Sequence, residues 1–190
     1  MKKSIGAKPL LCPSPVWVIG TYDAEGKPNI MTASWAGTCC SSPPCVAVSL
    51  RSATYSHAGI QLNQAFTVNV MPRSMMAESD FCGIASGRDT NKWEKAGLTP
   101  VRSELVNAPY IAEAPFVAEC VLKHTAELGL HTMFVGEIVD LKADATVLND
   151  KGKPEMKKID PFLFSMGDMQ YFAVGEVIAK AFEVGKIFCD

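Results

Sequence analysis

Short runs of alternating apolar and polar residues recur along this chain, separated by turn-forming residues. Runs with this period of two, rich in β-branched and aromatic side chains, are typical of strands buried on one face. The pattern predicts strands at residues 16–22, 29–35, 45–51, 65–71, 116–122 and 133–141. Residues 23–28 contain Gly26, which can adopt a positive φ, so the first two strands are expected to form a hairpin.

Helical segments are few and fall between the strands. Ser52 or Thr54 can cap a helix that runs to about Gln64. Helical spacing of apolar residues also covers residues 74–86, and a short helix over residues 91–97 ends at a glycine. Irregular structure is expected elsewhere: a loop with two prolines at 37–44, a connector at 100–109, a break between strands at 124–131, and a tail with short β segments at 161–186.

This arrangement predicts a mainly β protein. At least six short strands with a few inserted helices favour a closed or partly closed antiparallel barrel. The regular βαβ alternation of a doubly wound sheet is missing, and so is its Gly-x-Gly-x-x-Gly fingerprint. A length of 190 residues is that of one domain, which we expect to span 1–190.

Composition narrows the classes of function. The net charge is −2, the isoelectric point is about 5.9, and the chain has no basic stripe, so we expect no nucleic-acid partner. The first nine residues are too short and polar for a signal segment, and no apolar run reaches the length of a membrane span. We therefore expect a cytoplasmic protein without membrane contact.

The cysteines leave a second reading open. There are seven, an odd number that favours reduced thiols, and the simplest interpretation is that they are small buried hydrophobic residues. Cys39, Cys40 and Cys45 lie close together in sequence, although their spacing matches no standard ligand pattern for zinc or iron–sulfur clusters. A thiol or metal-binding module is therefore a distant alternative.

A candidate anion site lies where the strand over residues 45–51 leads into the first helix. The free amides of a helix start and the helix dipole both favour an anion. Arg51 adds a charge-assisted donor there, and Thr54, Tyr55 and Ser56 add hydroxyls. The alternative is a capped surface helix beside a solvated arginine.

A candidate site for a flat polar ring lies on the returning strand of the first hairpin. The backbone of Thr32, Ala33 and Ser34 is little obstructed by side chains and could meet the edge of such a ring. Asn29 offers a donor and an acceptor, and Trp35 could wall the pocket. The alternative is an ordinary amphipathic strand with Trp35 in the core.

These segments resemble the flavin-reductase-like, FMN-binding split-barrel family, and its flavoredoxin branch in particular. The resemblance rests on motifs spread over nearly the whole chain: Asn-x-Met-Thr-Ala-x-Trp at 29–35, Pro-Pro at 43–44, Ser-Leu-Arg-x-x-Thr-Tyr-Ser-His at 49–57, Phe-x-Val-Asn at 66–69, Ala-Ser-Gly-Arg-Asp-x-x-Lys at 85–92, Ala-Gly-Leu-Thr-Pro at 96–100 and Gly-x-x-x-Tyr-x-x-x-Gly-Glu at 167–176.

The resemblance implies an FMN-binding split β-barrel with Greek-key-like antiparallel topology, acting as a homodimer with FMN near the subunit interface. It implies that the ring is lined by Asn29, Met31, Thr32, Ala33, Ser34 and Trp35. The phosphate end would be held by Ser49, Leu50, Arg51, Thr54, Tyr55 and Ser56, with Lys92 as a second cation. The flavin carries the redox chemistry, so no catalytic protein residue and no metal are expected.

The implied activity is electron transfer through a tightly bound FMN, in the reduction of inorganic sulfur compounds in anaerobic sulfate-reducing bacteria. A low-potential carrier protein would then be the redox partner. The alternative is an NAD(P)H-dependent FMN reductase that uses diffusible flavin.

Overall fold

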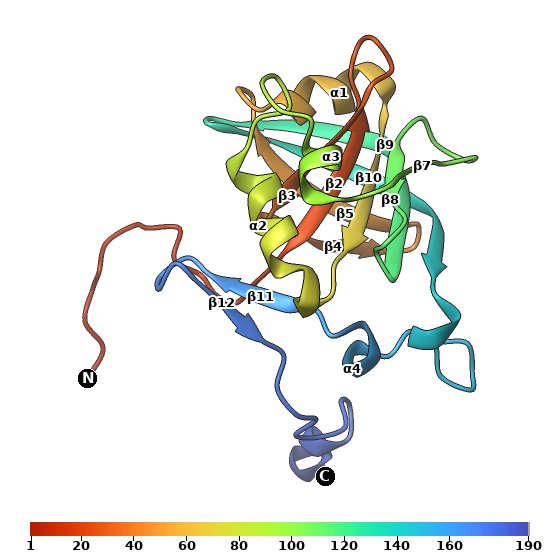
Figure 1. The fold of residues 1–190 in the computed structure, drawn as a ribbon. Helices are drawn as coiled ribbons and strands as arrows, with labels where there is room; N and C mark the ends of the chain where they lie inside the picture. Colours follow the sequence, from red (N-terminus) through yellow and green to blue (C-terminus); the bar gives the residue numbers. More distant parts are fainter. Residues whose placement is uncertain (190) are drawn as a thin grey trace.

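The computed structural model describes residues 1–189 and is dominated by one antiparallel sheet of seven strands (Figure 1). In the sheet the strands lie in the order β3-β2-β6-β9-β10-β5-β4. Their bounds are β2 (Trp17–Tyr22), β3 (Pro28–Ala33), β4 (Ala36–Ser41), β5 (Pro44–Arg51), β6 (Ala65–Val70), β9 (Phe116–Leu128) and β10 (His131–Ala143). The mainly β fold predicted from the alternating pattern is confirmed.

The strand order explains why this sheet is a split barrel. The sheet curls around a core but begins at β3 and ends at β4. Within residues 1–189, these two edge strands do not pair with each other, so the barrel is not closed. Four strands lie in the order β6-β9-β10-β5, so the connection from β5 to β6, which carries the first helix, gives a Greek-key arrangement. The antiparallel, Greek-key-like topology is confirmed, with the barrel left open.

Several predicted boundaries need correction. The loop expected at residues 37–44 is wrong, because 36–41 form strand β4. Pro43 lies in the turn and Pro44 begins β5 opposite Ser41, so neither proline interrupts a ladder. The break expected at 124–131 is also wrong, because β9 and β10 form one long hairpin whose turn contains Gly129 at φ 66°. The connector at 100–109 contributes to a small second sheet of β7 (Pro100–Arg102) and β8 (Pro109–Ile111).

The helices lie close to their predicted positions. They are α1 (Tyr55–Asn63), the 3-10 turn η1 (Arg73–Met75) leading into α2 (Met76–Ile84), α3 (Lys92–Ala96) and the short α4 (Met156–Ile159) after the 3-10 turn η2 (Ala145–Val147). Thr54 is the N-cap residue of α1, but its side chain makes no capping hydrogen bond. In α3 the Asn91 side chain accepts from the Glu94 amide, and Gly97 ends the helix at φ 64°.

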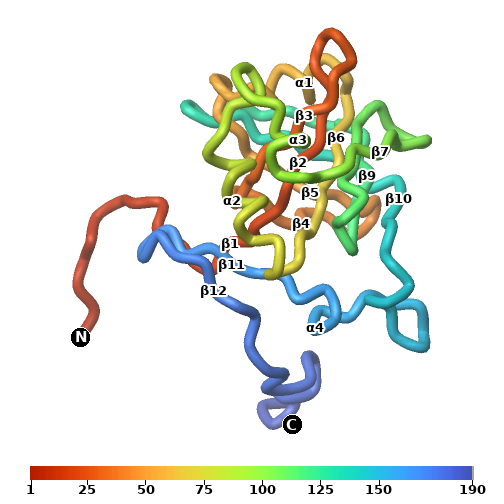
Figure 2. The backbone as a smooth tube through the Cα atoms, in the orientation of Figure 1, coloured from red at the N-terminus to blue at the C-terminus, as the bar shows by residue number. Residues whose placement is uncertain are grey.

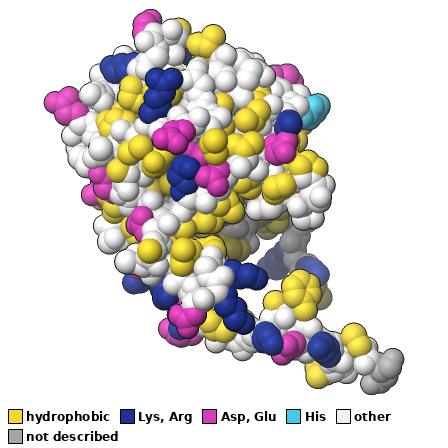
Figure 3. All heavy atoms as spheres, turned by 90° about the vertical axis from the view of Figure 1, so that its right-hand side faces the viewer, with side chains coloured by type: hydrophobic (Ala, Val, Ile, Leu, Met, Phe, Trp, Pro, Cys, Tyr) yellow, Lys and Arg dark blue, Asp and Glu magenta, His cyan; other side chains and the backbone are white. Residues whose placement is uncertain are grey.

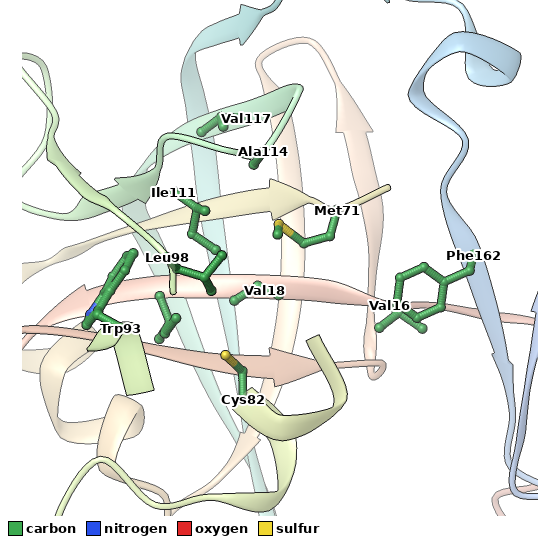
Figure 4. Close-up of a cluster of buried hydrophobic side chains, with 11 residues drawn as sticks. Val16, Val18, Met71, Cys82, Trp93, Leu98, Ile111, Ala114, Val117 and Phe162 are labelled. Atoms are coloured by element: carbon green, nitrogen blue, oxygen red, sulfur yellow. The ribbon is translucent and has the colours of Figure 1, made fainter. Parts of the chain in front are cut away.

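Two hydrophobic clusters lie on opposite faces of the sheet, as the alternation of a strand requires. The first fills the barrel and includes Ile19, Phe66 and Phe134, all fully buried. The second contains Val18, Met71, Cys82, Trp93 and Leu98 and lies under α2 and α3 (Figure 4). Cys82 of α2 and Trp93 of α3 share this cluster with Ile30 of β3, so both helices pack against that strand.

Both ends of the chain leave the barrel. β1 (Ser14–Pro15), β11 (Phe162–Ser165) and β12 (Gln170–Ala173) form a third small sheet beside it. The first residues and the segment after β12, which contains the 3-10 turn η3 (Val184–Phe188), extend away from the body of the molecule (Figure 2). The predicted tail with short β segments is confirmed. Within residues 1–189, no helix combines the length and the apolar character needed to cross a membrane.

Candidate functional site

A cavity of about 290 Å³ lies where the end of β5, the start of α1 and the segment joining α2 to α3 meet. Its position follows from the topology, because β5 runs directly into α1 while α2 and α3 are anchored on β3. The lining residues are Met31, Arg51, Ala53, Thr54, Tyr55, Ser56, Cys82, Gly83, Ile84, Ala85, Ser86, Gly87, Arg88 and Lys92.

Two arginines give the cavity its charge. Arg51 is the last residue of β5, and its carbonyl accepts from the Thr54 hydroxyl at 2.8 Å, which shapes the turn into α1. Arg88 comes from the other wall; its guanidinium lies 5.6 Å from the centroid of the Tyr55 ring and donates to the Ala53 carbonyl at 2.9 Å. Together with the start of α1, two guanidinium groups favour a bound anion such as a phosphate.

Hydrogen bonds between buried or partly buried side chains fix the polar wall. The Tyr55 hydroxyl donates to Asp23 at 2.8 Å, and this bond raises the pKa of Tyr55. The Asn29 amide donates to the Ser56 hydroxyl, also at 2.8 Å, with both side chains buried. Gly87 passes so close to this pair that an added Cβ would lie 2.1 Å from Asn29 Oδ1. Asn29 and Ser56 therefore position the wall, and only glycine fits at position 87 without movement of the loop.

Lys92 connects two walls of the cavity, strand β3 and helix α2. Its Nζ donates to the carbonyls of Ile30 on β3 and Cys82 on α2, each at 2.8 Å, and the residue is only 4% exposed. Burial lowers the pKa of the Lys92 ammonium. The observed contacts are with the backbone, and a phosphate contact through the third N–H remains a prediction.

The returning strand leads from this cavity to a neighbouring groove. Met31 lines the cavity, while Ser34, Trp35 and Ser49 line the groove together with β4 and residues 11–15. Met31 and Ser34 are three residues apart in the chain, roughly 10 Å if the backbone is extended. Trp35 is 39% exposed and meets His131 edge-on at 6.0 Å, so the alternative that placed it in the core is wrong.

The residues predicted as a site thus divide into three groups. Those that line the cavity are Met31, Arg51, Thr54, Tyr55, Ser56 and Lys92. Those in the groove are Ser34, Trp35 and Ser49. Behind these surfaces lie Asn29, Thr32, Ala33 and Leu50: Ala33 and Leu50 are core side chains, and the Thr32 hydroxyl donates to the Ser79 carbonyl.

Sequence reasoning missed the second arginine and the backbone around it. Ala85, Ser86, Gly87 and Arg88 line the cavity, and their motif was noted without being assigned a contact. The signal available was a glycine followed by an arginine in a polar loop, which is typical of a close backbone approach to a ligand.

The thiols also need correction. Cys45, Cys82 and Cys120 are buried as expected, but Cys12, Cys39, Cys40 and Cys189 are exposed. Burial raises the pKa of Cys82, beside Lys92, to about 11. Over residues 1–189, histidine, cysteine and acidic side chains nowhere gather in a group of three that could hold a metal ion. The three neighbouring thiols at 39, 40 and 45 therefore do not form such a metal site.

The fold and the site together define a split-barrel protein with a cationic cavity at the start of its first helix. Comparison with known proteins gives the family: residues 10–172 match the flavin reductase like domain, and the chain belongs to that family.

Solved structures of two similar proteins cover almost the whole chain. Flavoredoxin of Desulfovibrio vulgaris (Miyazaki F) is 48% identical, with a TM-score of 0.93 over 98% of this chain and 100% of that one. Flavoredoxin from Methanosarcina acetivorans is 32% identical, with a TM-score of 0.89 over 98% and 100% of the two chains. A ferric-chelate reductase (NAD(P)H) of Archaeoglobus fulgidus is 30% identical over 74% of this chain and 83% of its own.

Proposed function

We propose that this protein binds FMN in the cavity and transfers electrons through it. The observation that carries the proposal is the pairing of Arg51 and Arg88 at the start of α1, next to a strand that leads into an open groove. At one end of the site, cationic side chains and the start of α1 offer hydrogen-bond donors to a phosphate. At the other end, the backbone of Met31–Trp35 offers a surface to a flat ring. The similarity to two flavoredoxins along the whole chain supports the same cofactor.

The residues that line the cavity fit FMN as the cofactor. The cavity combines guanidinium and hydroxyl groups with the apolar side chains of Met31 and Ile84, as a ligand with a charged and a flat end requires. FMN, when bound, would accept and pass on electrons, so the protein's task is binding, orientation and electrostatics. Arg51 and Arg88 would neutralise the phosphate, and Thr54 and Tyr55 shape the turn into α1 that would hold it. Asn29, Ser56 and Lys92 keep the cavity walls in place.

Titration with two flavins tests the phosphate site. Arg51→Ala should weaken FMN by about ten- to a hundredfold, because a charge-assisted hydrogen bond contributes roughly 1.5–3 kcal/mol. Riboflavin, which lacks the phosphate, should lose little affinity. Arg102→Ala is the matched control, since Arg102 is an exposed arginine on β7 outside the cavity. Equal losses for both flavins would contradict the phosphate assignment.

Within this function, a carrier with retained FMN is favoured over a reductase that releases its flavin. Two arginines and a helix start around one phosphate should hold FMN through purification and leave the protein yellow. The reductase alternative is supported by the similarity to the ferric-chelate reductase (NAD(P)H). Stopped-flow bleaching of the flavin separates the two: we expect fast reduction by a low-potential electron-transfer protein and slow reduction by NADH or NADPH. Comparable rates for all donors would favour the reductase.

The downstream acceptors in this proposal are enzymes that reduce inorganic sulfur compounds. The support is the resemblance to the flavoredoxin branch. Cell extract depleted of the protein should lose flavin-dependent reduction of thiosulfate or sulfite, and the purified protein should restore it. Unchanged sulfur reduction after depletion would remove this part of the proposal while leaving FMN binding intact.

We also propose a homodimer. The segment that projects from the barrel carries exposed apolar side chains (Figure 3). Among them are Ile178, which is 97% exposed, and Phe182, which is 96% exposed. Of the aromatic residues in the C-terminal segment that could make such a contact, Phe162 is buried in the core of its own chain and Phe182 is exposed. Apolar surface of this kind usually finds a partner, and twofold symmetry is the commonest arrangement. Sedimentation of a monomer at micromolar concentration with FMN bound would contradict the dimer.

A further inference from the structure

Three cysteines gather near the turn of the β4–β5 hairpin, in which β4 is one open edge of the sheet. Cys39 and Cys40 lie on β4 and are exposed, and Cys45 lies on β5 with 7% exposure. Cys40 stands directly opposite Cys45 in the antiparallel register. Cys39 lines the groove beside Trp35, whereas Cys40 and Cys45 line neither the groove nor the cavity.

The register places Cys40 and Cys45 within reach of a disulfide bond. Directly opposed residues of antiparallel strands have Cα atoms about 4.5 or 5.5 Å apart, and both values lie within the roughly 4.4–6.8 Å range of disulfides. Opposed side chains also point to the same face of a sheet. Cys39 differs, because the register shifts between Thr38 and Cys40 and leaves Cys39 with no partner on β5.

The surroundings give the two thiols different roles. Cys40 is open to solvent, whereas burial raises the pKa of Cys45, with Cys40 and Cys39 adding to the shift. Across β5 and β10, Cys45 stands opposite Glu137, whose carboxylate forms an ion pair with Lys123 at 2.7 Å. An accessible thiol beside a shielded one is the arrangement of an attacking cysteine and a resolving cysteine.

We propose that Cys40 and Cys45 form a reversible dithiol–disulfide pair that exchanges with small-molecule disulfides. The Cys40 thiolate attacks one sulfur of the small disulfide, whose S–S bond breaks and releases one thiolate. The Cys45 thiol then gives its proton to solvent and attacks Cys40 Sγ, which expels the second small thiolate. The two cysteines are oxidised by two electrons, and the small disulfide is reduced to two thiols.

The consequence is a covalent link at the edge of the barrel. β4 begins at Ala36, next to Trp35 in the groove, and ends at the turn that the new bond would close. Oxidation therefore ties the edge strand to β5, whose other end carries Arg51. This pair is independent of the proposed FMN site, so either can fail without the other.

The test uses the full-length protein with Cys12→Ser and Cys189→Ser, since both of those thiols are exposed and would also react. The reduced protein is incubated with oxidised glutathione, its free thiols are capped with a maleimide under denaturing conditions, and its intact mass is measured without reductant. Relative to the reduced and capped protein, we expect two fewer maleimide adducts at Cys40 and Cys45, the loss of two hydrogens, glutathione at most on the exposed Cys39, and full reversal by dithiothreitol.

Three variants in this background decide which pair forms. Cys39→Ser should keep the mass loss, whereas Cys40→Ser and Cys45→Ala should abolish it. In Cys45→Ala, glutathione should remain attached at Cys40. Persistence of the intramolecular disulfide in Cys45→Ala, its loss in Cys39→Ser, or glutathione attachment without ring closure in the parent would each overturn the proposal. Because Cys40 is exposed, Cys40→Ser stays informative even if the Cys45 variant folds poorly.

Discussion

Replacing Lys92 by methionine removes an ammonium group that holds two walls of the cavity together. Nζ donates to the Ile30 and Cys82 carbonyls at 2.8 Å each, in a position that is 4% exposed. A hydrogen bond from a charged donor contributes roughly 1.5–3 kcal/mol, and a carbonyl left without a donor in a buried place costs about 1–3 kcal/mol. Against this, methionine avoids the desolvation that lowers the pKa of Lys92.

Balancing these terms, we expect Lys92→Met to lower the free energy of unfolding by about 2–4 kcal/mol. For a chain of this length that corresponds to a fall in Tm of roughly 5–15 °C. Urea unfolding followed by tryptophan fluorescence measures the change, since Trp93 is the next residue on α3. Lys95→Met is the matched control, because Lys95 lies on the same helix but is exposed and should change stability by less than about 0.5 kcal/mol.

The same variant separates a wall-holding role from a phosphate contact. If Lys92 acts through the two carbonyls, Lys92→Met should weaken FMN and riboflavin alike, because both flavins use the wall that moves. A loss confined to FMN would show that the third N–H meets the phosphate. A stability change no larger than that of Lys95→Met would refute the hydrogen-bond reasoning itself.

Three further predictions concern single contacts. Gly87→Ala should weaken FMN at least tenfold, because its Cβ would meet Asn29 Oδ1 at 2.1 Å and push the loop outward; a flavin titration with unchanged affinity would contradict this. Burial raises the pKa of the Cys120 thiol from 9.0 to about 12, so the folded protein keeps a proton that the unfolded chain loses. Stability should therefore fall between pH 9 and 12, by about 2–3 kcal/mol at pH 11, and urea unfolding of Cys120→Ala should show a shallower fall. Thr132→Val should cost about 1–3 kcal/mol, because the hydroxyl joins His57 Nε2 and Glu127 Oε2 at 2.8 Å each; an unchanged midpoint in urea would show that water replaces it.

Much of the fold could be predicted from the sequence because its signals are local. Alternation of apolar and polar residues locates the strands of the barrel, since each has at least one face in a core. Asn91 and Gly97 mark the ends of α3 through their own backbone preferences. The segment at 36–41 escaped this reasoning because it is an edge strand, largely exposed and rich in small residues, so it shows no alternation.

Only part of the candidate site could be predicted from the sequence, for a similar reason. Arg51 and the start of α1 are adjacent in sequence, so a strand-to-helix signal could place them together. Arg88 is 37 residues further along (88 − 51), and it joins them only because α2 and α3 pack on β3 and carry their connecting segment over Tyr55.

The sequence by itself determined the mainly β class, the helix ends and the strand-to-helix turn at Arg51, because each depends on residues within a few positions of one another. Only the tertiary structure decided which side chains face the cavity. Asn29 and Lys92 are polar residues that the sequence offered as ligand contacts. Packing placed Asn29 behind the cavity wall, where it donates to Ser56, and placed Lys92 in the wall, where its ammonium donates to two backbone carbonyls. A buried polar group must find a partner, and which partner lies within reach is set by the arrangement of distant segments rather than by local pattern.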